Sequence, residues 1–108
     1  MKTYHYSADK VQDEIDTAQT MLDTALMDIM MNGNEELSQE AAETFAFRNH
    51  DEVTKRLQIK HEFKFGMSSI YLNMDFYIST ALSDELDKVF AKHMTRAGFK
   101  HNEGIFTN

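Results

Sequence analysis

The hydrophobic positions of the chain change their spacing near its middle. Over residues 11–29 the apolar side chains recur every three or four residues, as on one side of an α-helix. Over residues 57–78 they alternate with polar side chains, as in β-strands. The first pattern predicts a helix from residue 8 to residue 32, ended by Gly33, and Asn34 then caps a second, shorter helix.

Two runs of strict alternation predict a β-hairpin. The first run covers residues 57–65 and the second covers residues 70–78, with a turn over residues 66–69 between them. Because successive side chains of a strand point to opposite faces, each strand should have one buried face and one polar face.

The remaining residues predict a further helix and two further strands. Ser83 caps a helix that runs to about Ala97, and one strand covers residues 99–106. A short alternation over Lys2–Tyr6 predicts a first strand. The order is that of an α+β, ferredoxin-like split βαββαβ fold, with an antiparallel sheet and helices on one face. Without the first strand, the fold would be a helical hairpin leading into a ββα unit.

The charges divide the chain in the same way as the hydrophobic pattern. Residues 1–52 hold twelve Asp/Glu against three Lys/Arg, whereas residues 53–108 hold six against eight, and the net charge is −7. We expect one domain over residues 1–108, with an acidic helical half at about 7–50 and the remaining elements at about 55–107. An acidic surface attracts basic partners and repels nucleic acid.

Composition and missing motifs limit the chemistry. The chain has no cysteine, so disulfides and thiolate chemistry are excluded. It has no G-x-S-x-G segment and no glycine-rich phosphate loop. It also lacks the apolar core of a signal peptide and any run of transmembrane length. We therefore expect a cytoplasmic protein that is not an enzyme, has no catalytic residues, binds no cofactor and does not enter a membrane.

The first functional hypothesis is a protein that docks on a basic surface through its acidic helices. Acidic residues on the outer side of a helix often serve only solubility. Here, however, two methionines fall on the same polar side, and methionine suits an adaptable protein-binding surface. The predicted partner-binding residues are Asp9, Asp13, Asp16, Asp23, Met27, Met31, Glu35, Glu36, Glu40 and Glu43.

No sequence motif assigns the chain to a family. In its small size, acidic charge and lack of motifs, the chain is similar to small acidic bacteriophage proteins that inhibit host machinery such as restriction or CRISPR nucleases. This similarity implies a viral protein with an anti-host-defence or anti-CRISPR role. Its partner would then be a nucleic-acid-handling protein with a basic surface.

The alternative hypothesis is binding of RNA or single-stranded DNA by the open face of the sheet. Exposed tyrosines beside lysines could stack on bases, although the glycine-aromatic consensus of RNA-recognition domains is missing. The residues that this hypothesis needs are Lys60, Lys64, Tyr71 and Tyr77. The same face could instead be solvated or be covered by a second copy of the chain, as in a symmetric homodimer.

Histidines provide the weakest candidate site. His5, His61 and His93 are expected to point into the layer between helices and sheet, where three imidazoles could bind a divalent metal. None of them has the close spacing of a metal-binding motif, so each is better explained by a single hydrogen bond. His50, next to two acidic residues in a polar linker, is the other candidate for acid–base chemistry.

Overall fold

The computed structural model describes residues 8–47, 50, 57–64, 66–74 and 78–107. For Ala8, Asp9 and Lys64 it describes the backbone only. The predicted first strand lies outside the described residues.

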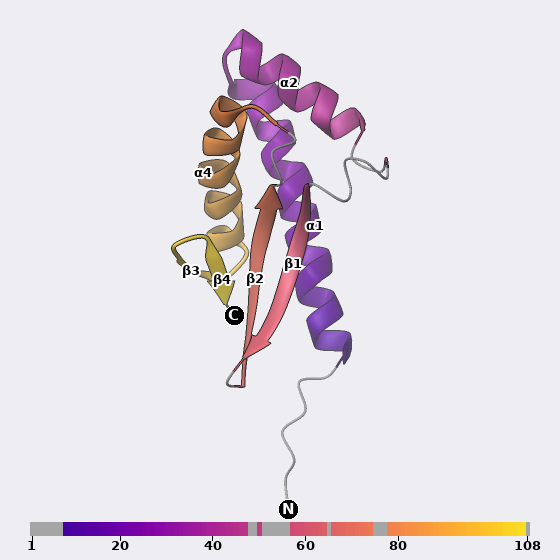
Figure 1. The fold of residues 1–108 in the computed structure, drawn as a ribbon, viewed down its shortest axis with the longest axis vertical. Helices are drawn as coiled ribbons and strands as arrows, with labels where there is room; N and C mark the ends of the chain where they lie inside the picture. Colours follow the sequence, from indigo (N-terminus) through magenta and orange to yellow (C-terminus); the bar gives the residue numbers. More distant parts are fainter. Residues whose placement is uncertain (1–7, 48–49, 51–56, 65, 75–77, 108) are drawn as a thin grey trace, which may run out of the picture.

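Two helices form the N-terminal half of the described chain. Helix α1 spans Ala8–Asn32 and α2 spans Glu35–Ala46, and they pack against each other as a helical hairpin (Figure 1). As predicted, the side chain of Asn34 caps α2, because it accepts a hydrogen bond from the backbone N–H of Leu37 at 2.9 Å. Between the helices, a Cβ at Gly33 would come within 2.6 Å of a backbone oxygen of α1, so only glycine fits this tight turn.

The predicted β-hairpin is present. Strand β1 spans Leu57–Lys64, β2 spans Met67–Met74, and the two pair antiparallel over their full length. The turn is shorter than predicted, so β2 begins at Met67 rather than at Ile70. Leu57 and Ile70 are buried, as the alternation predicts, whereas Phe63, on the same predicted apolar face, is 53% exposed.

Helix α4 spans Thr80–Arg96, so it begins before the predicted cap at Ser83. The cap is Ser79, whose side chain accepts a hydrogen bond from the N–H of Leu82 at 3.1 Å. Gly98 follows the helix with a φ of +102°, a left-handed conformation that favours glycine at a helix C-terminus.

The C-terminal segment is a hairpin and not the single strand predicted over residues 99–106. Strands β3, Lys100–Asn102, and β4, Ile105–Thr107, are joined by two residues with positive φ, Glu103 at +49° and Gly104 at +82°. These angles are those of the tight turn that links antiparallel strands. Both strands are therefore only three residues long.

The four described strands form an antiparallel sheet in the order β1-β2-β4-β3. In a ferredoxin-like sheet the N-terminal strand separates the hairpin from the last strand. Here β4 pairs directly with β2 at Ser69–Tyr71, so the ferredoxin-like order is not confirmed, whereas the α+β class is.

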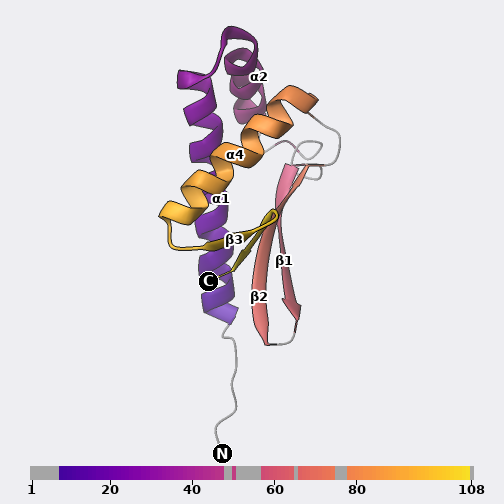
Figure 2. The ribbon, with the colours of Figure 1, turned by 90° about the vertical axis from the view of Figure 1, so that its left-hand side faces the viewer.

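The helices and the sheet form two layers. Figure 2 shows α1 and α4 on one side of the strands, and α2 lies across one end of these helices. The core fills the space between the layers. Its buried members are Ala18, Leu22, Ala25, Leu26 and Ile29 of α1, Ala41 of α2, Leu82, Leu86, Phe90 and Met94 of α4, and Leu57, Ile70, Phe99 and Phe106.

Candidate functional site

The side of α1 that faces away from the core carries carboxylates followed by methionines. Asp13 and Asp16 are exposed, and Met27 and Met31 expose 43% and 76% of their surface. At 100° per residue these four side chains point opposite to the buried face of the helix. We call them the outer stripe of α1. At 1.5 Å per residue the stripe is roughly 27 Å long.

Within the described part of the chain, Asp13 and Asp16 of the outer stripe form no ion pair with the protein's own cations. Asp28 pairs with Lys92 and His93, and Lys10, Glu14 and Asp23 take part in further interactions within the chain. Five acidic residues of the predicted docking surface are exposed and form no ion pair with another described residue. They are Asp13, Asp16, Glu35, Glu36 and Glu43.

Three of the predicted docking residues stand apart from this group. Asp23 is half-buried and takes part in another interaction within the chain, and the side chain of Asp9 is not described. Glu40 has a structural role, because its carboxylate accepts hydrogen bonds from the N–H (2.9 Å) and the hydroxyl of Ser79. It thereby joins α2 to the start of α4.

The open face of the sheet brings together part of the predicted nucleic-acid site. Lys60 is exposed and lies directly opposite the half-buried Tyr71 on the neighbouring strand. Tyr77 and the side chain of Lys64 are not described. A hollow of about 420 Å³ beside Tyr71 is lined also by Glu62 and Glu103, so two carboxylates share this face.

His61 belongs to a polar network that joins the hairpin to α1. Its Nε2 lies 2.6 Å from the hydroxyl of Ser68, and this hydroxyl donates a hydrogen bond of 3.0 Å to the carboxylate of Glu14. Ser68 and Glu14 are only 6% and 5% exposed. A buried carboxylate is costly unless it accepts hydrogen bonds, so this network secures the packing of α1 on the sheet.

The direction of these hydrogen bonds decides what the network can do. A hydroxyl has one proton, and Ser68 gives it to Glu14, so the Nε2 of His61 is the donor in the other bond. A serine nucleophile activated by histidine needs the opposite arrangement, with histidine accepting the serine proton. We therefore interpret the network as structural.

His93 also has a single partner rather than a metal-site geometry. Its Nε2 lies 2.9 Å from a carboxylate oxygen of Asp28, which Lys92 also contacts at 3.1 Å. The hydrogen bond from His93, followed by those from Asn32 and Lys92, holds the pKa of Asp28 well below its usual range. This carboxylate binds α1 to α4, and the sequence analysis did not identify it.

The described histidines do not converge. His61 and His93 lie in separate networks, His5 is outside the described residues, and His50 is exposed against the ring of Phe47. Over the described ranges, no three His, Cys, Asp or Glu side chains are grouped so that they could hold a metal ion.

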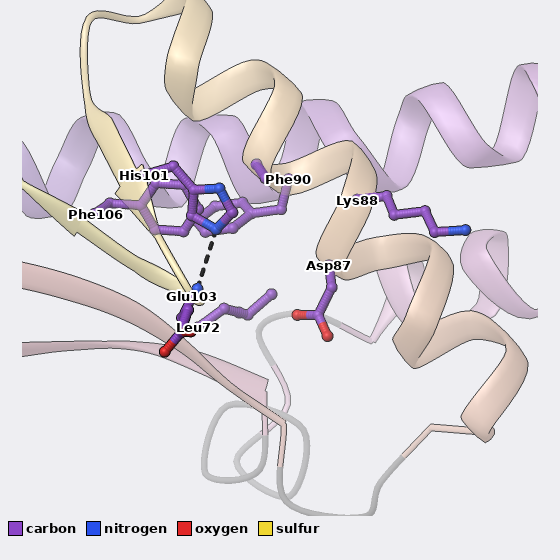
Figure 3. Close-up of a pocket in the computed structure, with 9 residues that line it drawn as sticks. Leu72, Asp87, Lys88, Phe90, His101, Glu103 and Phe106 are labelled. Atoms are coloured by element: carbon purple, nitrogen blue, oxygen red, sulfur yellow. Dashed lines mark hydrogen bonds between the residues drawn. The ribbon is translucent and has the colours of Figure 1, made fainter.

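The structure also contains a cavity that the sequence did not predict. A cavity of about 390 Å³ lies between α4, β2 and the terminal hairpin, with Asp87 and His101 among its lining residues (Figure 3). Burial, followed by the negative charge of Asp84, raises the pKa of Asp87. The sequence offered no local indication, because these residues meet only when the hairpin folds beside α4.

Comparisons of the chain with protein-family models, with curated proteins and with solved structures gave no match. None of the helices in the described ranges has both the length and the apolar character needed to cross a membrane. The functional argument therefore depends on the surfaces and cavities themselves.

Proposed function

We propose that this chain is a non-enzymatic acidic binding protein that docks on a basic surface of another macromolecule. The observation that carries the proposal is the set of exposed carboxylates along α1 and α2 that form no ion pair with described cations of the same molecule. Charges left unpaired in this way extend their field into solvent and accelerate association with an oppositely charged partner.

The methionines supply contact area that the carboxylates alone would not provide. Met27 and Met31 follow the carboxylates along the same outer stripe of α1. A flexible thioether side chain adapts to an irregular partner surface and gains free energy when its apolar area leaves water. In this division of roles the carboxylates determine the association rate and the methionines slow dissociation.

The chemistry of the surface favours one class of partner. Proteins that handle nucleic acid present basic surfaces to phosphates, and an array of carboxylates can occupy such a surface in their place. The partner we propose is therefore a nucleic-acid-handling protein in the cytoplasm. Inhibition of that protein, in the manner of small bacteriophage proteins that act against restriction or CRISPR nucleases, is the specific form of the proposal.

Direct binding of nucleic acid by the open sheet face remains the alternative. The cross-strand pair of Lys60 and Tyr71 favours it. Against it, Glu62 and Glu103 line the hollow beside Tyr71, where their carboxylates would repel a phosphate backbone. Burial of the same face in a homodimer would also exclude nucleic acid.

The test compares two double charge reversals in the full-length chain. Asp13→Lys with Asp16→Lys alters the outer stripe of α1, and Glu62→Lys with Glu85→Lys makes the same change in net charge elsewhere. Immobilised wild-type protein should retain specific proteins from a lysate of its native cells at low salt and release them at high salt. The α1 variant should lose them, with association to the purified partner slowed roughly tenfold or more.

The control variant decides between a docking surface and a general charge effect. Proteins retained by the control but not by the α1 variant would support the proposal. Equal losses in both variants would contradict it, because only net charge would then matter. Binding of a mixed-sequence single-stranded oligonucleotide at low salt, abolished by Tyr71→Ala, would favour the sheet-face alternative instead.

A further inference from the structure

The cavity of about 390 Å³ exists because β4 is short. Strand β4 pairs with β2 only at Ser69–Tyr71, so from Leu72 onward β2 has no described neighbour on that side. α4 and the turn of the terminal hairpin border the gap, and the cavity lies there (Figure 3). We call it the α4–hairpin pocket. Its lining includes Leu72, Asp87, Phe90, His101, Glu103 and Phe106.

One wall of the α4–hairpin pocket consists of three aromatic rings in contact. The imidazole of His101 lies parallel to the ring of Phe106, with centroids 4.6 Å apart and an angle of 16° between the planes. The rings of Phe106 and Phe90 are nearly perpendicular, with an angle of 81° between their planes and centroids 5.2 Å apart. Phe106 and Phe90 are buried, whereas His101 is exposed, so His101 presents a flat aromatic surface on top of a rigid base.

His101 carries no charge in this arrangement. The backbone N–H of Gly104 donates a hydrogen bond of 3.0 Å to its Nε2. An Nε2 that accepts a hydrogen bond is unprotonated, so the ring proton is on Nδ1 and the imidazole is neutral. The wall therefore does not repel a cation.

Asp87 is one of three charged residues that line the pocket, together with Lys88 and Glu103. Its carboxylate points into the cavity, and within the described chain it accepts no hydrogen bond and forms no ion pair. The ammonium group of Lys88 extends away from it (Figure 3). Asp87 is exposed as a whole residue, and the partial burial of its carboxylate, followed by the negative charge of Asp84, raises its pKa.

We propose that the α4–hairpin pocket binds the guanidinium group of an arginine side chain, which stacks on His101 and pairs with Asp87. A guanidinium is flat, stacks on aromatic faces and donates two parallel hydrogen bonds to a carboxylate, whereas an ammonium group offers only a point charge. Glu103 at the same cavity adds negative charge. The assignment of this arginine to a basic protein partner depends on the proposed function. The binding of a guanidinium group by the pocket does not depend on it.

The experiment uses a capped Gly-Arg-Gly peptide as the probe and the isotope-labelled full-length chain. Nuclear magnetic resonance titration should shift the amide signals of Ala91, His101 and Gly104. Asp87→Asn should weaken this binding roughly three- to tenfold. Glu36→Gln removes the same charge from a remote exposed site on α2 and should leave the affinity unchanged.

Three results would overturn the inference. They are the absence of shifts at the pocket, equal shifts with a capped Gly-Leu-Gly peptide, and equal weakening by Asp87→Asn and Glu36→Gln. The pocket and the proposed function can be tested separately, because charge reversal of Asp13 and Asp16 should leave the peptide titration unchanged. If the pocket binds the peptide but the outer stripe of α1 binds no partner, only the proposed function is refuted.

Discussion

Two carboxylates on the two flanks of α4 have opposite environments. Asp28 reaches one flank from α1 and accepts hydrogen bonds from His93, Lys92 and its neighbour Asn32, so its pKa is lowered. Asp87 lies on the other flank without a described partner, and its pKa is raised. The first carboxylate is bound into the fold, whereas the second belongs to an exposed residue and has no described hydrogen bond or ion pair. Such a position can take a partner from another molecule.

The same comparison extends to Glu14 and to the outer stripe of α1. Glu14 is buried and receives a hydrogen bond from Ser68, whereas Asp13 on the same helix is exposed. One helix therefore has a carboxylate that holds the fold together and exposed carboxylates that we propose for partner binding. Substitutions should separate the two kinds by their effects on stability.

The largest loss of stability is expected when the buried network is broken. Ser68→Ala removes the hydroxyl that bridges His61 and Glu14, and leaves a buried carboxylate short of a donor. We expect the free energy of unfolding, measured by urea denaturation, to fall by about 1–3 kcal/mol. Ser69→Ala is the matched control, because that hydroxyl makes only a long hydrogen bond of 3.3 Å, and its effect should stay within about 0.5 kcal/mol. Equal effects would contradict a role for Glu14 in the fold.

A smaller loss is expected at Asp28, and it should depend on pH. Asp28→Asn weakens the contacts to His93 and Lys92, and should cost about 1–2 kcal/mol at neutral pH. Because the folded pKa of Asp28 lies below its unfolded value of 3.8, its contribution is complete above about pH 4 and is lost as the pH falls through the folded pKa. The difference in unfolding free energy between wild type and variant should therefore shrink in acid. A difference that stays constant from pH 7 to about pH 2 would refute this assignment.

The smallest effect is expected at Asp87. Asp87→Asn removes a partly desolvated charge with no described partner, so stability at neutral pH should stay within about 0.5 kcal/mol of wild type or rise. Because a raised folded pKa makes the ionised form unfavourable, any gain should disappear as the pH falls and wild-type Asp87 takes up its proton. Thermal unfolding at neutral and acidic pH measures both effects. A clear loss of stability at neutral pH would show that Asp87 has a structural partner.

The sequence predicted correctly those helices and strands that are determined by the hydrophobic pattern of their own residues. The alternation predicted β1, in which Leu57 is buried and Ile59 and His61 are half-buried. The apolar stripe of α1 ends at a glycine that the tight turn requires. The start of α4 was mispredicted because Ser79 and Ser83 are both suitable caps. Ser79 is used, and its N–H and hydroxyl also bond to Glu40, a contact between segments far apart in the sequence.

The terminal hairpin and the α4–hairpin pocket escaped prediction for a related reason. Glu103 adopts a positive φ that favours glycine or asparagine, so the turn was not recognised, although Gly104 was a usable indication. The pairing of β4 with β2 has no local signature, and the meeting of His101 with Asp87 depends on it. On the outer stripe of α1, by contrast, the exposed positions of Asp13, Asp16, Met27 and Met31 followed directly from helical periodicity.

The exposure of Met31 has a chemical consequence of its own. Peroxide converts a thioether to a sulfoxide, which is polar and prefers water to an apolar contact. Met31 exposes 76% of its surface and Met94 none, so oxidation would reach the outer stripe of α1 and spare the core. If the outer stripe binds a partner as we propose, oxidative damage would release that partner while the molecule stays folded, and a sulfoxide reductase could restore binding.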